Sequence, residues 1–181
     1  VVILGVWQGT RRRAGRTIGS TGRLLRVWWF YLASTTLFFY IGYRGWLPLN
    51  WNFPPQFRIW MLIFGSLLYF PGMAFTLWAR ITLGKNYFVS TGFGAQLFAD
   101  HQLIMKGPFA IVRHPMYAGI CLLYIASPVA LGSFWALIPA LLIVPILIAR
   151  IRNEEEVLRR ELPGYVEYTQ KVKYRLLPGV W

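Results

Sequence analysis

Three long uncharged runs divide the chain, covering residues 27–43, 59–79 and 115–149. Segments containing arginine or lysine separate them. A helix that crosses a bilayer needs about 20 predominantly apolar residues. The first run is near the lower limit of that length, and the second fits it well. Each of these two runs therefore predicts one membrane-spanning helix.

The third run is too long for a single span. One helix over residues 114–149 would be roughly 54 Å long, against a hydrocarbon core of about 30 Å. Two helices joined as a hairpin fit the bilayer better, with the turn near Leu131, Gly132 and Ser133. The sequence therefore predicts a helical hairpin in the C-terminal half of the chain.

The remaining segments are more polar. Residues 81–112 contain several glycines and a proline, and they predict a loop or a re-entrant segment with no membrane span. Beyond the third run the pattern favours a helix over residues 153–162 and a break at Pro163 and Gly164. A further helix is expected over residues 165–174.

Composition adds the class of protein. Hydrophobic residues make up 56% of the chain and charged residues only 14%, whereas a soluble domain carries about 25% charged residues. We therefore expect an integral membrane protein. The net charge of +13 is attributed to topology and to contact with membrane lipids, and no nucleic acid is expected as a partner. The single cysteine, Cys121, leaves no partner for an intrachain disulfide.

Basic residues predict the orientation. Only Arg44 and Arg58, of 19 lysines and arginines, fall between the first two runs. By the positive-inside rule the N-terminus, the central loop and the C-terminal tail face the cytoplasm. Because the chain begins at Val1, we expect residues upstream of it, and the number of spans is therefore given as four or five. The predicted fold is an all-α integral membrane protein, multi-pass, with four or five transmembrane helices.

Acidic residues divide the chain into two parts. All six lie at or after position 100, so the polar chemistry is expected in the second half. Residues 1–96 are predicted to form an N-terminal transmembrane scaffold. Residues 97–181 are predicted to form the catalytic half, with a cofactor-binding loop, the hairpin and a C-terminal helix.

Two polar segments bracket the hairpin, at residues 101–119 and 150–156. Because a hairpin brings its two ends together, these segments should meet at the cytoplasmic membrane face. This arrangement would bring together both histidines of the chain, several arginines and three glutamates. We therefore expect a pocket there that is open to both water and lipid.

These two segments carry a resemblance to a known family. The run HQLIMKGPFAIVRHPMYAG, the apolar hairpin, and then RIRNEEEVLRRELPGYVEY resemble the isoprenylcysteine carboxyl methyltransferases and their prokaryotic relatives in the phospholipid methyltransferase-like superfamily. The resemblance covers residues 97–181. It implies methyl transfer from S-adenosyl-L-methionine to the carboxylate of a lipophilic, isoprenylcysteine-like acceptor that enters from the bilayer. S-adenosyl-L-homocysteine would be the product.

The resemblance also implies roles for individual residues. Arg150 would lie on the acceptor side, and Glu155 is assigned with it to catalysis. No metal site is expected. Phe109 stands where the family usually has tyrosine, so stacking is retained there but a hydroxyl is lost. The donor site would be formed by His101, Gln102, Leu103, Ile104, Phe109, His114, Pro115, Met116, Tyr117 and Glu154.

Elementary chemistry agrees with these roles. A glutamate suits the ammonium or the ribose diol of the donor, and aromatic faces suit its sulfonium. A carboxylate acceptor is already ionised at neutral pH and needs no base. Arginine binds a carboxylate through a bidentate fork. Arg150 and Glu154 are one helical turn apart, which puts them on one face of a helix.

Other functions fit parts of the same pattern. A phospholipid N-methyltransferase would share the donor site, but its amine acceptor needs a base, for which Glu155 or His101 is a candidate. A membrane sterol-reductase-like oxidoreductase shares the HPxYxG-like element. A transporter is disfavoured because the three runs contain no Asp, Glu, Lys, Arg or His. Taken alone, the arginines also suit interfacial anchors, the glutamates suit a solvated helix start, and residues 171–175 suit lipid contact.

Overall fold

The computed structural model describes residues 53–86 and 101–181, together with the isolated positions 33, 36 and 40. Every regular element in residues 53–86 and 101–181 is helical. The predicted first span, over residues 27–43, lies outside the described residues apart from those three positions. The count of four or five spans therefore stays a prediction. The elements are α3 (Pro55–Leu83), η2 (Gly84–Asn86), η3 (Gly107–Ala110), α4 (Pro115–Ala130), α5 (Phe134–Glu161) and α6 (Tyr165–Lys171).

Helix α3 contains the second predicted span and extends it at both ends. It begins at Pro55, whose fixed backbone angle suits the first helical position. It ends before Gly84, which has a φ of 50°. Its 29 residues are about 43 Å long, enough to cross a bilayer. Large apolar side chains such as Trp60 and Leu67 are exposed along it, which suits contact with lipid.

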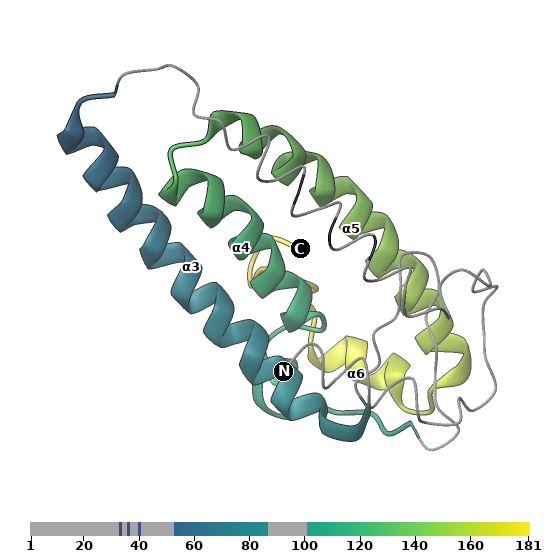
Figure 1. The fold of residues 1–181 in the computed structure, drawn as a ribbon. Coiled ribbons are helices and arrows are strands. Elements are labelled where there is room, and N and C mark those ends of the chain that lie inside the picture. The colour runs from purple at the N-terminus through teal and green to yellow at the C-terminus, as the bar shows by residue number, and fades with distance from the viewer. Residues whose placement is uncertain (1–32, 34–35, 37–39, 41–52, 87–100) are drawn as a thin grey trace.

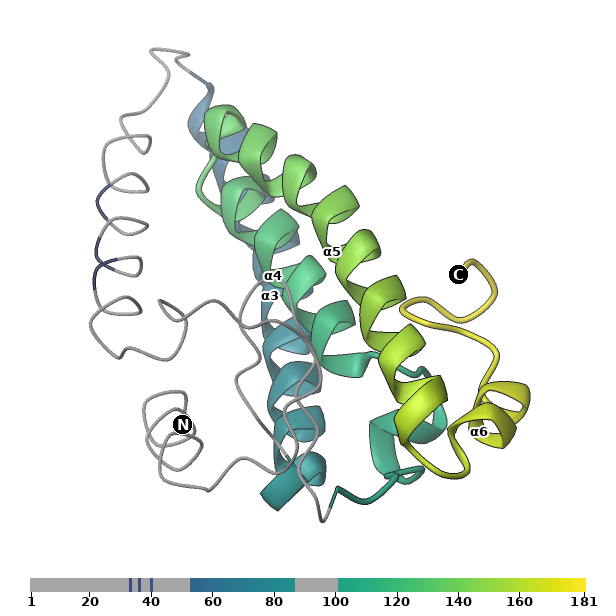
Figure 2. The ribbon, with the colours of Figure 1, turned by 90° about the vertical axis from the view of Figure 1, so that its right-hand side faces the viewer.

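Helices α3 and α4 lie side by side (Figures 1 and 2), and small residues allow their backbones to approach closely. A Cβ added at Gly65 would lie 2.4 Å from the backbone nitrogen of Ala130. A Cβ added at Gly119 would lie 2.1 Å from Oγ1 of Thr76. Glycine at such positions is typical of helix pairs in membranes, where tight packing replaces the hydrophobic driving force.

The predicted hairpin is confirmed. Its turn covers Leu131, Gly132 and Ser133, with Gly132 at a φ of 64°. Ser133 caps α5 by accepting a hydrogen bond from the backbone nitrogen of Ala136 at 3.3 Å. The two arms differ in length, because α4 has 16 residues, or about 24 Å, and α5 has 28 residues, or about 42 Å. Helices α3 and α5 are long and apolar enough to cross a membrane, whereas α4 is a shorter apolar helix.

The polar segment after the third run forms the end of α5. The helix predicted over residues 153–162 is confirmed as far as Glu161, and it is the end of α5, which continues without a break from Phe134. Neither proline nor glycine occurs between Pro145 and Pro163 to end it. The glutamates at positions 154–156 therefore lie inside a helix and do not begin one, unlike the alternative of a solvated helix start.

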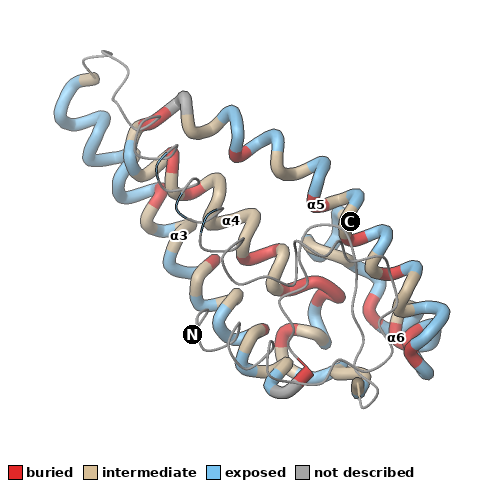
Figure 3. Tube along the Cα trace, turned by 45° about the vertical axis from the view of Figure 1, so that its right-hand side comes forward, coloured by how far each residue is buried: buried red, intermediate tan, exposed pale blue. Residues whose placement is uncertain are grey.

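The last segments pack against the polar end of α5. A break at Pro163 and Gly164 is confirmed, with Gly164 at a φ of 79°. Helix α6 ends at Lys171, earlier than expected. A small apolar cluster of Leu162, Tyr165, Tyr168 and Val172 forms here, with Leu103 and Leu158 packed against it. Buried positions gather where the loop before α4 meets this end of the molecule (Figure 3).

Candidate functional site

The loop before α4 is buried over four successive residues, from Val112 to Pro115. Pro115 occupies the first turn of α4, and His114 before it has a non-helical backbone, as a residue preceding proline prefers. One turn into the helix, the Tyr117 ring stacks on the His114 ring, with centroids 5.8 Å apart and planes at 28°. The HPxY motif therefore builds one aromatic pair at the polar end of the hairpin.

Tyr117 joins the two α5 residues that the sequence placed in the site. Its hydroxyl donates a hydrogen bond to Oε2 of Glu154 at 2.8 Å. The same hydroxyl accepts a hydrogen bond from Nε of Arg150 at 2.7 Å, and the guanidinium carbon lies 5.6 Å from the tyrosine ring centroid. Arg150 and Glu154 are one turn apart on α5, as expected. The structure thus brings together residues from two separate motifs.

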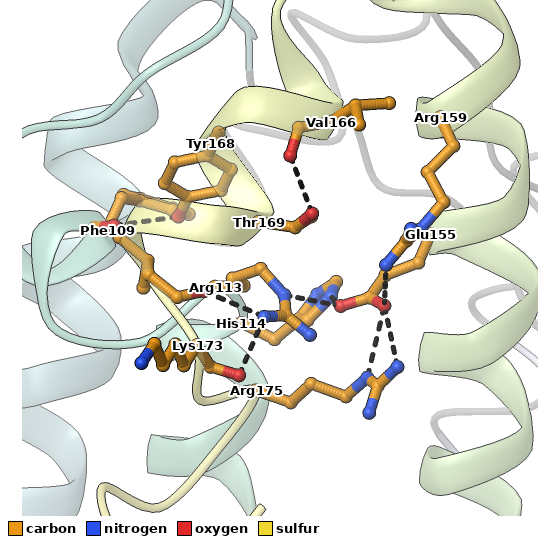
Figure 4. Close-up of polar contacts among 11 residues, drawn as sticks. Phe109, Arg113, His114, Glu155, Arg159, Val166, Tyr168, Thr169, Lys173 and Arg175 are labelled. Carbon is orange, nitrogen blue, oxygen red and sulfur yellow. Dashed lines mark hydrogen bonds and ion pairs between the residues drawn. The ribbon is translucent and has the colours of Figure 1, made fainter.

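Glu155 points into a different environment from Glu154. Only 2% of the residue is exposed. Its Oε1 atom lies 2.7 Å from Nε of Arg113 and 3.3 Å from Nε2 of His114. Its Oε2 atom lies 3.0 Å from Nη2 of Arg175, with Nη2 of Arg159 more distant at 3.9 Å. Figure 4 shows these side chains converging on the carboxylate.

This environment bears on the chemistry assigned to Glu155. Neighbouring cations and hydrogen-bond donors favour the charged form of a carboxyl group, whereas a base must take up a proton during the reaction. The geometry therefore argues for a fixed counter-ion in place of the catalytic base considered from the sequence. The spacing of the glutamates alone did not separate the two roles, because adjacent helical residues point in different directions.

The predicted donor segment, His101 to Ile104, begins the second described range. The backbone carbonyl of Gln102 accepts a hydrogen bond from Nδ2 of the buried Asn86 at 2.8 Å. Leu103 packs against the apolar cluster around α6. The contacts given for this segment are thus with η2 and α6, near the end of α3 and the polar end of α5.

Phe109 lies in η3, close to the same end. Its carbonyl oxygen accepts a hydrogen bond from the Tyr168 hydroxyl at 2.7 Å. The turn packs closely on α3, since a Cβ added at Gly107 would lie 3.2 Å from Oγ1 of Thr82. The described contact of Phe109 is therefore made through its backbone, and it fixes the turn that leads into the loop before α4.

Four residues near the site were not among the predicted site residues: Arg113, Tyr165, Tyr168 and Arg175. The first three lie within the two runs that carry the family resemblance, but no role was assigned to them. The two arginines are 62 positions apart (175 − 113) and share no motif, and Arg175 was assigned only to lipid contact. Burial raises the pKa of both tyrosines above its ordinary value of 10.0. Both phenols are therefore neutral at physiological pH and available as hydrogen-bond donors.

Comparison with known proteins identifies the class, which is a membrane methyltransferase. The chain matches the phospholipid methyltransferase family over residues 60–163, or 104 of its 181 residues. The chain therefore belongs to the phospholipid methyltransferase family. The matched region contains most of α3, the loop before α4 and the whole hairpin. No curated protein sequence matches the chain.

A solved structure has a similar fold. It is that of the eukaryotic intramembrane Ras methyltransferase ICMT (isoprenylcysteine carboxyl methyltransferase), with a TM-score of 0.55 and 23% sequence identity. The match covers 67% of this chain and 43% of that one, so this chain matches less than half of that protein's length. At this identity the likeness concerns the fold. The family match confirms the phospholipid methyltransferase-like superfamily that the motifs indicated, and the solved structure agrees with it in fold.

Proposed function

We propose that this membrane protein transfers a methyl group from S-adenosylmethionine to the carboxylate of a lipophilic, isoprenylcysteine-like acceptor. S-adenosylhomocysteine is the second product. The observation that carries the proposal is the hydrogen-bonded group of Arg150, Tyr117 and Glu154. It puts a carboxylate, an aromatic face and a guanidinium together at the polar end of an apolar hairpin.

The residues of this group fit the donor. When bound, S-adenosylmethionine supplies a methyl group activated on a positively charged sulfur. Glu154 is half-buried, and its carboxylate suits an ammonium or a pair of ribose hydroxyls. The stacked rings of His114 and Tyr117 offer the aromatic faces that attract a cation. His101 to Ile104, Phe109, Pro115 and Met116 remain proposed as the other residues of the donor site.

Arg150 suits the acceptor. Its Nε donates to the Tyr117 hydroxyl, which fixes the side chain at the start of the polar part of α5. A guanidinium so held orients a carboxylate for in-line attack on the methyl group, and alignment of this kind supplies most of the rate in such a displacement. The acceptor carboxylate is already ionised and gives up no proton. The environment of Glu155 agrees with chemistry that needs no base.

The apolar part of the hairpin supports entry of the acceptor from the bilayer. Pulling a lipid tail into water costs about 0.8 kcal/mol per CH₂ group, so a path between helices is favoured. By the distribution of basic residues the chain is multi-pass, with the site facing the cytoplasm. The oligomeric state is left open.

A second candidate follows from the family. Phospholipid methyltransferases give the family its description, and a phospholipid amine is the corresponding acceptor. An amine must lose a proton before or during attack. With Glu155 held by arginines, His101 is the remaining base that the sequence suggested.

Product analysis distinguishes the two candidates. The purified protein is incubated with deuteromethyl-labelled donor and either S-farnesylated N-acetylcysteine or vesicles of phosphatidylethanolamine. We expect label on the farnesylated acid, as an ester that mild alkali cleaves. Alkali-stable label on the phospholipid amine would favour N-methylation. Absence of label on both, in protein that binds S-adenosylhomocysteine, would remove the proposed acceptor class.

Substitutions of Glu154 and Arg150, the two α5 residues of this group, should affect different quantities, namely donor affinity and turnover. Glu154→Gln removes a charge from the donor side, so affinity for S-adenosylhomocysteine should fall by about tenfold or more. Arg150→Lys keeps the charge but loses the fork, so it should leave that affinity nearly intact and lower turnover. Calorimetric titration separates the two effects. The reverse pattern would show that the roles are exchanged.

A further inference from the structure

We propose that Arg175 is a positioning residue for the donor site, through which the C-terminal tail, residues 172–181, holds the His114 loop in its binding conformation. This inference rests on the proposed function, since it concerns the same donor site. Arg175 lies beyond the matched family region. It belongs to a basic stretch that the sequence explained by topology and lipid contact alone.

The tail is attached to the loop through the backbone. The amide nitrogen of Arg113 donates to the carbonyl of Tyr174 at 2.9 Å, and that of His114 donates to the carbonyl of Arg175 at 2.9 Å. The Arg113 side chain adds two hydrogen bonds from Nη1, to the carbonyls of Val172 at 2.7 Å and Lys173 at 2.8 Å. The tail therefore lies directly against the residues that begin the HPxY motif.

The Arg175 side chain is held from two sides. Its Nε and Nη2 atoms lie 3.1 Å and 3.0 Å from Oε2 of Glu155. On its other side the guanidinium carbon lies 5.0 Å from the Trp181 ring centroid. The Trp181 carbonyl accepts from the amide of Arg175 at 2.8 Å and from that of Leu176 at 3.0 Å. The end of the tail thus folds back and fixes Arg175 toward Glu155.

Glu155 connects the C-terminal tail to the donor site. While Oε2 is held by Arg175, Oε1 accepts from Arg113 and contacts Nε2 of His114. The His114 ring stacks on Tyr117, whose hydroxyl bonds to Glu154. An unbroken series of contacts therefore runs from the tail to the glutamate proposed to bind the donor (Figure 4 shows its first part). If the Glu155 carboxylate rotated, its contact with His114 would be lost before its hydrogen bond to Arg113, because the contact with His114 is the longer of the two.

Two other arginines near Glu155, Arg113 and Arg159, differ from Arg175 in how they contact its carboxylate. Arg113 stays paired with Oε1 in the absence of Arg175, so the buried carboxylate is not left without a partner. Arg159 is 3.9 Å from Oε2, and its side chain is 46% exposed, where an ion pair contributes little. Loss of Arg175 is therefore expected to loosen the carboxylate without unfolding the protein, and Arg159 provides a matched control.

The test uses the full chain in detergent micelles, with Arg175→Gln, Arg175→Lys and Arg159→Gln compared with the unsubstituted protein. Three quantities are measured: the Kd for S-adenosylhomocysteine, the KM for each substrate, and the Tm. We expect Arg175→Gln to raise the Kd and the donor KM by about tenfold, as loss of a hydrogen bond to a charged group gives. The acceptor KM should change less than about twofold. Arg175→Lys should recover part of the loss, and Arg159→Gln should change neither constant.

Several outcomes overturn the inference. One is an Arg175→Gln protein whose Tm and active fraction fall while its donor KM stays unchanged, which is the result of a merely structural role. Another is an equal change in Arg159→Gln. The third outcome applies if Arg175→Gln does not fold. It is an Arg175→Lys protein whose Kd for S-adenosylhomocysteine is unchanged. A protein that binds S-adenosylhomocysteine, loses it in Glu154→Gln and keeps it in Arg175→Gln refutes this inference alone. No binding by the unsubstituted protein refutes the proposed function as well.

Discussion

Arg113 donates a hydrogen bond from Nε to Oε1 of Glu155 at 2.7 Å, across 42 positions of sequence, and both side chains are buried. The pair joins the loop before α4 to the far end of α5. It therefore closes the hairpin at its polar end, opposite the turn at residues 131–133. The hydrogen-bonded group of Arg150, Tyr117 and Glu154 lies at this closed end.

Replacing Glu155 should be strongly destabilising. In Glu155→Gln, Arg113 and Arg175 face each other with no carboxylate between them, and breaking a buried ion pair typically costs about 3–5 kcal/mol. Glu156→Gln is the matched control, since Glu156 is exposed and pairs only with Arg160 one turn away among the described residues. Thermal unfolding in detergent measures both. Equal Tm values for the two variants would mean that the buried cluster does not stabilise the fold.

Tyr117→Phe should impair both sides of the proposed reaction. The substitution removes the hydroxyl that bonds Glu154 and Arg150 but retains the ring that stacks on His114. We expect affinity for S-adenosylhomocysteine and turnover each to fall by about tenfold. Tyr174→Phe, at an exposed tyrosine of the tail, should change neither quantity. A loss of turnover with unchanged donor affinity would show that the hydroxyl serves Arg150 alone.

Tyr165 and Tyr168 should respond oppositely to the loss of a hydroxyl. The Tyr165 hydroxyl is buried and finds no hydrogen-bond partner among the described residues, and such a group costs about 1–3 kcal/mol. The Tyr168 hydroxyl donates to the carbonyl of Phe109 at 2.7 Å. Tyr165→Phe should therefore keep or raise the Tm, and Tyr168→Phe should lower it. A lower Tm in Tyr165→Phe would reveal a partner outside the described residues.

Cysteine labelling tests the predicted orientation. The only cysteine, Cys121, is first replaced by alanine. Single cysteines are then placed at the exposed positions Lys106, Lys171 and Arg58. An impermeant maleimide should reach positions 106 and 171 from the cytoplasmic side and position 58 from the other side. Labelling of positions 58 and 106 from one side would contradict a single crossing by α3.

The sequence predicted the elements near the site well. The long uncharged run over residues 115–149 required two helices, and the glycine at position 132 fixed the turn. The spacing of Arg150 and Glu154 predicted one helix face, and their shared contact with Tyr117 agrees with it. The sequence also predicted a helix that ends before Pro163, and α5 ends at Glu161, one residue earlier than expected.

Hydropathy, charge distribution and two motifs determined the class of this protein, the hairpin and the family, since each of these depends on local patterns or on spacing along the chain. Only the tertiary structure decided which partners Glu154 and Glu155 have. Neighbours on a helix point in different directions, so Glu154 meets Tyr117 while Glu155 meets Arg113, His114 and Arg175. Those partners come from the loop before α4 and from the C-terminal tail. Contact between such distant segments follows from packing, which no local pattern records.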